Sequence, residues 1–304
     1  MENRDAELAD KITSLKKRRK AIILVHNYQL GEVQDIADFV GDSLELSRKA
    51  AETNTDIIVF CGVHFMAETA SIICPDKTVL LPDAHAGCPM ADMITAERLR
   101  EEKKEHPKAT VVCYVNSSAA VKAESDVCCT SANAVRIVEK LVDAEQILFV
   151  PDQYLGNYVS SKTGREMILW PGYCPTHIRI QPQDISRLKA EHPQAKAVVH
   201  PECRPDVIAL ADAVLSTGGI IRFARETEAE EIIVGTEIGI LHRLRKENPG
   251  KRFIPASDQA VCPRMKLITL ETILWSLENM THQVKVPERT RLRAKAAVDK
   301  MLDG

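Results

Sequence analysis

Three cysteines recur along the chain at nearly equal intervals, and each precedes a proline in a loop-like setting. They are Cys88 in "GCPM", Cys174 in "YCPT" and Cys262 in "VCPR", spaced 86 and 88 residues apart. A fourth Cys-Pro pair begins at Cys74, but it aligns with "NPGK" at 248–251, where the cysteine does not recur. Because cysteine thiolates bind metals, the spacing predicts one metal site with a ligand from each third of the chain.

The residue types leave two kinds of metal centre open. Zinc takes four protein ligands in a structural site, or three and a water in a catalytic one, but the sequence lacks the tight CxxC spacing of typical zinc sites. Cysteines also hold [4Fe–4S] clusters, usually four of them. With three, one iron keeps an open position that can act as a Lewis acid on a substrate oxygen or nitrogen. We expect one [4Fe–4S] cluster per chain and non-redox chemistry such as dehydration or condensation.

Residues that can move protons lie near the ends of three apolar runs. One equivalent set is His26, Tyr114 and His200, and the set two residues later on the same side of an extended chain is Tyr28, Asn116 and Glu202. Histidine and tyrosine can donate protons, and a carboxylate or a neutral histidine can accept them. The residues expected to carry out acid–base catalysis are His26, Tyr28, His200 and Glu202.

A third equivalent set carries hydroxyl groups at predicted helix starts, namely Ser43, Ser131 and Thr217. Such residues commonly serve as N-caps, and a helix N-terminus that bears a hydroxyl also binds phosphate or carboxylate. Three of them facing one centre would suit a substrate with several negative groups. Ser216 and His177 are also predicted to bind substrate, although His177, three residues after Cys174, could instead support or join the metal ligands.

These equivalences come from an internal repeat, which a self-comparison at the cysteine spacing reveals. The runs "AIILVHNY" (21–28), "ATVVCYVN" (109–116) and "AKAVVHPE" (195–202) align without gaps, and Asp38, Asp126 and Asp212 fall in register after them. Helical and β-rich stretches then alternate up to each Cys-Pro pair. Each copy is therefore predicted to contain strand, helix, strand, helix and strand, followed by the cysteine.

The repeat predicts an α/β protein, because apolar strands that alternate with helices form parallel sheets with helices on both faces. We expect three homologous three-layer α/β/α domains with short parallel sheets, arranged about a pseudo-threefold axis. Their predicted ranges are 1–94, 95–180 and 181–268, and a C-terminal helical tail at 269–304 is expected to pack back on the first repeat. Ligands bind beyond the carboxyl ends of such strands, where the polar sets lie.

Composition limits the partners. The net charge is −3, so nothing indicates a nucleic-acid or acidic-membrane partner. The basic run "KKRRK" at 16–20 is expected to end a first helix, where cations complement the helix dipole. No signal-peptide apolar region precedes it, and no apolar run approaches the length of a membrane span. We therefore expect a cytoplasmic protein whose nine cysteines are reduced.

An ordered set of motifs resembles the quinolinate synthase family over about residues 20–280. The motifs are "HNYQ", "DIADFVGDSL", "GVHFMAE", "PDAHAGCPMA", "YVNSSA", "CTSANA", "CPTH", "HPEC", "STGG", "GTEIG" and "AVCPRM". The resemblance implies three α/β domains around a central [4Fe–4S] cluster, held by Cys88, Cys174 and Cys262. It also implies a reaction of NAD biosynthesis, in which iminoaspartate and dihydroxyacetone phosphate condense to quinolinate with loss of phosphate and water. An L-aspartate oxidase or dehydrogenase would supply the iminoaspartate.

The resemblance also assigns roles to residues. The positions that would hold substrate are His26, Ser43, Tyr114, Asn116, Ser131, His200, Glu202 and Thr217, and Tyr28 matches a position implicated in proton transfer. Arg222, just after "STGG", has no fixed alignment. Two alternatives stay open at this point: another [4Fe–4S] hydro-lyase acting on a small dicarboxylate, and a non-catalytic zinc-stabilised scaffold or small-anion-binding protein.

Overall fold

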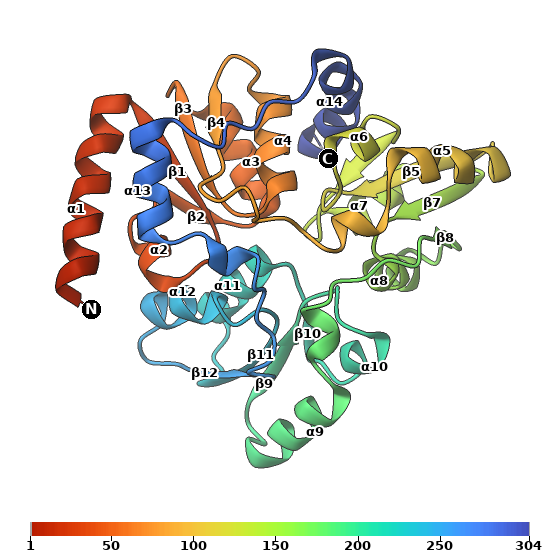
Figure 1. The fold of residues 1–304 in the computed structure, drawn as a ribbon. Helices are drawn as coiled ribbons and strands as arrows, with labels where there is room; N and C mark the ends of the chain where they lie inside the picture. The colour runs from red at the N-terminus through yellow and green to blue at the C-terminus, as the bar shows by residue number, and fades with distance from the viewer. Residues whose placement is uncertain (1, 304) are drawn as a thin grey trace.

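A computed structural model describes residues 2–303, which form three separate four-stranded sheets in which all paired strands are parallel (Figure 1). The first has the order β2 (Phe39–Gly41), β1 (Ala21–His26), β3 (Ile57–Cys61), β4 (Thr78–Leu80). The second has the order β6 (Val127–Cys129), β5 (Ala109–Tyr114), β7 (Gln146–Val150), β8 (Ile168–Leu169). The third has the order β10 (Ala213–Val214), β9 (Lys196–Val199), β11 (Glu231–Gly235), β12 (Arg252–Pro255). The prediction of an α/β fold with parallel sheets is confirmed.

Each sheet contains one more strand than we predicted. The extra strands β2, β6 and β10 are two or three residues long, too short to show a period of their own. The helices after the strands are α2 (Gly31–Asp35), α3 (Ser43–Glu52) and α4 (His64–Ile73); α6 (Ala119–Lys122), α7 (Ala134–Lys140) and α8 (Gln153–Thr163); and α10 (Pro205–Ile208), α11 (Thr217–Glu226) and α12 (Ile240–Glu247). Each series ends in a 3₁₀ turn: η1 (Ala91–Met93), η2 (His177–Arg179) or η3 (Met265–Leu267). We call residues 21–93, 109–179 and 196–267 the first, second and third units.

The aspartates that align in the sequence make the same contact in every unit. A carboxylate oxygen of Asp38 accepts the backbone N–H of Ile23 at 2.8 Å, and Asp126 and Asp212 do so for Val111 and Ala197 at the same distance. Each aspartate also donates its own backbone N–H back to the same strand residue. The contact closes the crossover from the first strand of a unit to its short neighbour, so the repeated spacing of the aspartates has a structural cause.

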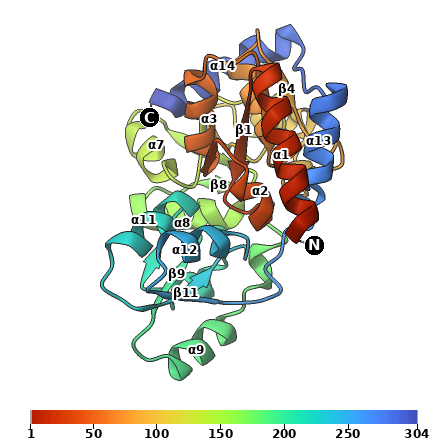
Figure 2. The same cartoon turned by 90° about the vertical axis from the view of Figure 1, so that its left-hand side faces the viewer.

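The remaining helices precede or follow the units. They are α1 (Glu2–Arg19), α5 (Ala96–Glu105), α9 (Pro182–Glu191), α13 (Leu270–Asn279) and α14 (Glu288–Asp303). Figures 1 and 2 both show α13 lying beside α1, so segments from the two ends of the chain pack together. Helix α14 lies against α4 of the first unit and against α6 and β6 of the second. The tail therefore touches two units.

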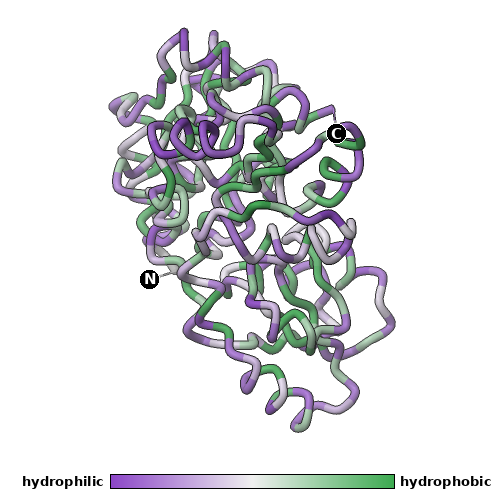
Figure 3. The backbone as a smooth tube through the Cα atoms, turned by 90° about the vertical axis from the view of Figure 1, so that its right-hand side faces the viewer, coloured by the Kyte–Doolittle hydropathy of each residue, from purple (hydrophilic) through white to green (hydrophobic). Residues whose placement is uncertain are grey.

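Apolar residues fill the interior, as the hydropathy along the chain shows (Figure 3). One continuous cluster of buried side chains joins the first unit, the second unit and the C-terminal helices. The third unit has two clusters of its own, because Ala197 and Val199 face one side of its sheet and Val198 the other. Within residues 2–303, no helix is long and apolar enough to span a bilayer.

Candidate active site

One cavity is lined by side chains from all three units. The predicted site residues that line it are His26, Tyr28, Ser43, Cys88, Tyr114, Asn116, Ser131, Cys174, His177, His200, Glu202, Thr217 and Cys262. They lie at the carboxyl ends of strands or in the turns just after them, where ligands of parallel sheets bind. The repeat thus brings together residues that are up to 236 positions apart in the chain.

Each of the three cysteines begins a turn that directs backbone N–H groups at its own sulfur. The N–H groups belong to the residues two and three positions later: Met90 and Ala91, Thr176 and His177, and Arg264 and Met265. Such hydrogen bonds stabilise a negatively charged sulfur and, in metal centres, tune the metal. Three equivalent turns around one cavity fit a group held by three thiolates.

Without a cation the thiols are neutral. Burial raises the pKa of Cys88 to about 12 and also raises that of Cys174 and Cys262, although the turn N–H groups oppose this. A bound metal would replace these protons. Cys174, His177 and Glu202 also place one ligand atom each within 4.8 Å of one another, so this side of the cavity is well supplied with metal-binding atoms.

Two histidines in the cavity have a defined orientation of their ring nitrogens. Nδ1 of His26 accepts the backbone N–H of Tyr28 at 3.2 Å, and Nδ1 of His200 accepts that of Glu202 at 3.3 Å. Burial lowers the pKa of both imidazoles to about 3, so both are neutral. Their protons therefore lie on Nε2, and His200 donates its proton to the Ser131 hydroxyl at 3.1 Å.

Glu202 is a buried carboxylate at the centre of the site. Its Oε1 accepts the Tyr114 hydroxyl at 2.5 Å, and its Oε2 lies 2.7 Å from Nδ1 of His177. The Asn116 amide donates to Oε1 at 3.5 Å. Burial alone would raise the pKa of Glu202, but His177 and the Tyr114 hydroxyl hold it well below its usual range. Glu202 is therefore ionised.

Tyr28 is linked to this carboxylate through residues of the other units. Its hydroxyl lies 2.5 Å from Oγ1 of Thr236, which lies 2.8 Å from Nε2 of His177. Because Nδ1 of His177 faces Glu202, a continuous line of polar atoms joins Tyr28 to Glu202. Burial raises the pKa of Tyr28 well above its usual value, so the phenol is protonated. Thr236 was not predicted from the sequence, because the equivalent positions of the other copies carry no hydroxyl.

The helix starts differ in detail from the prediction. The cap of α3 is Asp42, which accepts the N–H groups of Leu44 and Glu45, and the cap of α11 is Ser216, which accepts that of Gly219. Ser43 and Thr217 are the first residues inside these helices. Their hydroxyls are therefore not the N-caps. Ser131 lies before α7, whose N-cap position is Asn133, so it does not begin a helix. Ser216 is the one predicted site residue that does not line the cavity in the part of the chain the structure describes.

A buried carboxylate that was not predicted from the sequence supports the third cysteine. Glu237, in "GTEIG", accepts the backbone N–H of Cys262 at 3.0 Å and that of Gly239 at 2.7 Å. Lys266 pairs with it at 3.0 Å. A charged residue directly after an apolar strand, as in "IIVGTE", was the signal that could have revealed it.

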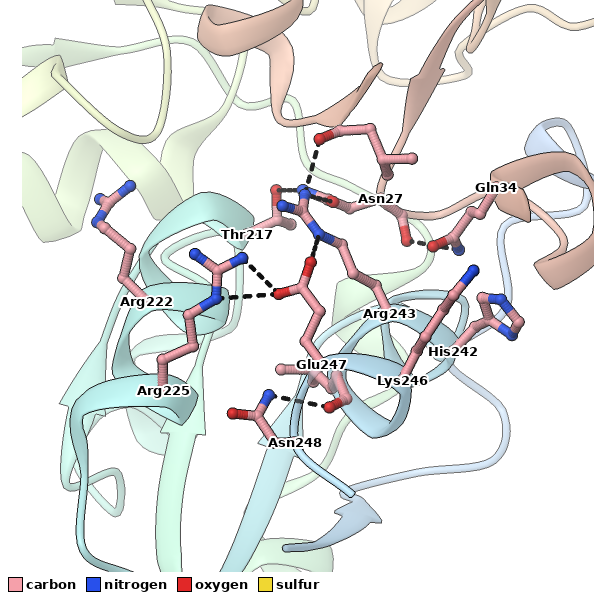
Figure 4. A network of polar contacts seen from close by, with 12 residues as sticks. Asn27, Gln34, Thr217, Arg222, Arg225, His242, Arg243, Lys246, Glu247 and Asn248 are labelled. Atoms are coloured by element: carbon pink, nitrogen blue, oxygen red, sulfur yellow. Dashed lines mark hydrogen bonds and ion pairs between the residues drawn. The ribbon is translucent and has the colours of Figure 1, made fainter. Parts of the chain in front are cut away.

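Arg222 lies outside the cavity. Its side chain is 58% exposed, and its guanidinium lies 4.0 Å from Glu45. Figure 4 shows it pointing away from the contacts around Thr217. Within residues 2–303 it is absent from the cavity lining.

Comparison with known proteins identifies the family of the chain. The family model described as "Quinolinate synthetase A protein" (NadA) matches residues 10–303. A quinolinate synthase of Dehalococcoides mccartyi (strain CBDB1) is 62% identical over 97% of both chains. Those of Geotalea uraniireducens and Methanosarcina barkeri are 57% and 56% identical over 97% and 98% of this chain and 97% of their own. The chain therefore belongs to the quinolinate synthase family.

Proposed function

We propose that the chain is a quinolinate synthase, which condenses iminoaspartate with dihydroxyacetone phosphate to quinolinate and releases phosphate and water. The observation that carries this proposal is the single cavity in which three cysteine turns, two Nε2–H imidazoles and an ionised glutamate meet. The relatives that bear the same name cover the chain almost completely, which supports the same reaction here.

Cys88, Cys174 and Cys262 would hold a [4Fe–4S] cluster. When bound, such a group supplies a Lewis-acidic iron without a protein ligand. The fit of the donors rests on the repeated sulfur-facing N–H pairs, since each copy offers one thiolate in the same surroundings. His177 and Glu202 would lie beside the group near Cys174.

The remaining cavity residues would bind and orient two small anionic substrates. Neutral His26 and His200 offer Nε2–H donors, and the hydroxyls of Ser43, Ser131 and Thr217 line the same cavity. Neutral donors can bind carboxylate or phosphate oxygens without a fixed counter-charge. Holding both substrates in one cavity makes the condensation effectively intramolecular.

Proton movement would centre on Tyr28 and Glu202. We assign the acceptor role to the ionised Glu202, whose Oε2 lies next to Nδ1 of His177, and the donor role to the protonated Tyr28 hydroxyl. The hydroxyl of Thr236 connects the two sides through His177. Tyr114, whose phenol is bound to Oε1, keeps Glu202 in place.

The division of the chain into domains belongs to the same proposal. We assign three homologous three-layer domains about a pseudo-threefold axis, with ranges 1–94, 95–180 and 181–268 and a tail at 269–304. The identical strand order of the three sheets and the repeated aspartate contact support it.

All nine cysteines are free thiols, which supports a reducing compartment such as the cytoplasm. An L-aspartate oxidase or dehydrogenase would deliver the iminoaspartate.

An anaerobic assay tests the proposal. Purified enzyme is supplied with freshly generated iminoaspartate, with and without dihydroxyacetone phosphate, and quinolinate is measured. Quinolinate that forms only with both substrates supports the proposal, whereas turnover of a dicarboxylate alone would favour a different hydro-lyase. Iron and acid-labile sulfide are measured on the same sample, and zinc without sulfide would favour the scaffold or anion-binding alternative.

A further inference from the structure

A buried amide of the first unit contacts a cavity hydroxyl of the third. Asn27, between His26 and Tyr28, has no exposed surface, and its Nδ2 lies 3.0 Å from Oγ1 of Thr217. On its other side, Oδ1 of Asn27 accepts Nη1 of Arg243 at 2.9 Å (Figure 4). Neither Asn27 nor Arg243 lines the cavity in the described part of the chain, so neither contacts a ligand there.

The partner on each side fixes the orientation of this amide. A guanidinium only donates hydrogen bonds, so the atom of Asn27 that faces Arg243 must be the oxygen. The NH₂ group therefore faces Thr217 and donates to its hydroxyl oxygen. A hydroxyl whose oxygen accepts a hydrogen bond in this way directs its own proton to another acceptor, and Thr217 lines the cavity.

Arg243 is itself held firmly, which prevents the amide from turning over. The second hydrogen of its Nη1 goes to the backbone oxygen of Val40 at 2.8 Å, and its Nε donates to Glu247 at 2.8 Å. Glu247 also accepts two hydrogen bonds from Arg225 on helix α11, the helix that Thr217 begins. The network therefore closes on the helix that carries the hydroxyl (Figure 4).

We infer that Asn27 and Arg243 are positioning residues that set the direction of the Thr217 hydroxyl, so that it donates its proton to a carboxylate or phosphate oxygen of the ligand. This inference rests on the proposed function, which supplies an anionic ligand. A hydroxyl free to rotate would present a lone pair as readily as a proton. Fixing the proton toward the cavity removes the repulsive orientation before the anion arrives.

The test is a nearly isosteric change, Asn27→Asp. A carboxylate at position 27 still accepts from Arg243, but it also accepts the Thr217 proton and so reverses that hydrogen bond. The lone pairs of Thr217 then face the anion. We expect the Kd of the anaerobically purified holoenzyme for quinolinate, measured by calorimetry, to rise roughly 10- to 100-fold, the range of one hydrogen bond to a charged group. Thr217→Val should weaken binding by a similar factor, and Thr217→Ser should restore it.

A double-mutant cycle separates this effect from the added charge. In the Thr217→Val background, Asn27→Asp should cause little further loss, because no hydroxyl is left to reverse. The control background is Ser131→Ala, which removes a hydroxyl that contacts His200 and not Asn27. In that background, Asn27→Asp should still cause its full loss of quinolinate affinity. If Asn27→Asp disturbs the far-ultraviolet circular dichroism, Arg243→Met replaces it in both backgrounds, with the same expectation.

Three results would overturn the inference: unchanged quinolinate affinity in Thr217→Val, unchanged affinity in Asn27→Asp, or an equal loss from Asn27→Asp with and without the Thr217 hydroxyl. A wild-type holoenzyme that neither forms nor binds quinolinate would instead contradict the proposed function. The two failures are therefore distinguishable in one set of titrations.

Discussion

The hydroxyl of Tyr114 donates to Oε1 of Glu202 at 2.5 Å, joining the second unit to the third inside the cavity. Tyr114→Phe removes this hydrogen bond and leaves a buried carboxylate with one donor fewer. We expect the free energy of unfolding, from urea titrations, to fall by about 1.5–3 kcal/mol. Tyr158→Phe is the matched control, because that hydroxyl donates to a neutral backbone oxygen, of Val214, at 3.3 Å and should cost less. Equal losses in the two variants would show that the Glu202 contact is not special.

Cys174→Ala should abolish both metal binding and quinolinate formation, since it removes one of three thiolates. Iron, acid-labile sulfide and the anaerobic absorption spectrum are the measurements. Cys203→Ala is the control: this buried thiol contacts the backbone oxygen of Gly235, outside the cavity lining within residues 2–303, so the variant should keep its metal. A colourless Cys174→Ala protein that still produced quinolinate would show that the reaction does not need the proposed cluster.

Glu237→Gln should both destabilise the protein and loosen the loop of Cys262. The change leaves Lys266 without its buried counter-charge and weakens the acceptor of the Cys262 N–H. Removing one partner of a buried ion pair costs about 3–5 kcal/mol, and the partial exposure of Lys266 places the expected loss near the lower end. Urea titrations measure it. Adding Lys266→Met should recover part of the loss, and a purely additive double variant would contradict this explanation.

Glu124 should make the packing of α14 sensitive to acid. Burial would raise the pKa of Glu124, but Arg293 of α14 and Arg100 of α5 lower it below its usual value. A carboxylate with a lowered folded-state pKa stabilises the fold above its unfolded pKa of about 4.3, and this contribution disappears as the pH falls through the folded value. Glu124→Gln should therefore lower Tm at pH 7 and make progressively less difference below about pH 4. A constant difference in Tm across this range would contradict the assignment.

The repeat explains why so much of the site could be predicted from the sequence. Parallel strands end at one edge of each sheet, and equivalent edges of the three sheets line one cavity, so aligning three copies was enough to group Cys88 with Cys174 and His26 with His200. The same logic failed where copies differ. Thr236 has no hydroxyl counterpart, and Ser216 shares its chemistry with Thr217 but faces Asp42 instead of the cavity.

Individual hydrogen bonds between units could not be predicted. The Asn27–Thr217 hydrogen bond joins residues 190 positions apart, and it depends on how the first and third sheets are turned toward each other. The residue pattern within each segment does not determine the angle between the two sheets. The short strands β2, β6 and β10 were missed for a different reason, since two or three residues held by a neighbouring strand need no propensity of their own.

The distribution of the cysteine turns over the three units has a consequence for biogenesis. A nascent polypeptide emerges from the ribosome with Cys88 first and Cys262 last, and most of the chain has been synthesised before the third thiol exists. In the proposed enzyme, a group held by all three thiolates would be complete only after the third unit has been translated, and a product truncated before Cys262 would lack one of its ligands. Assembly of the proposed centre would therefore depend on translation reaching the third unit.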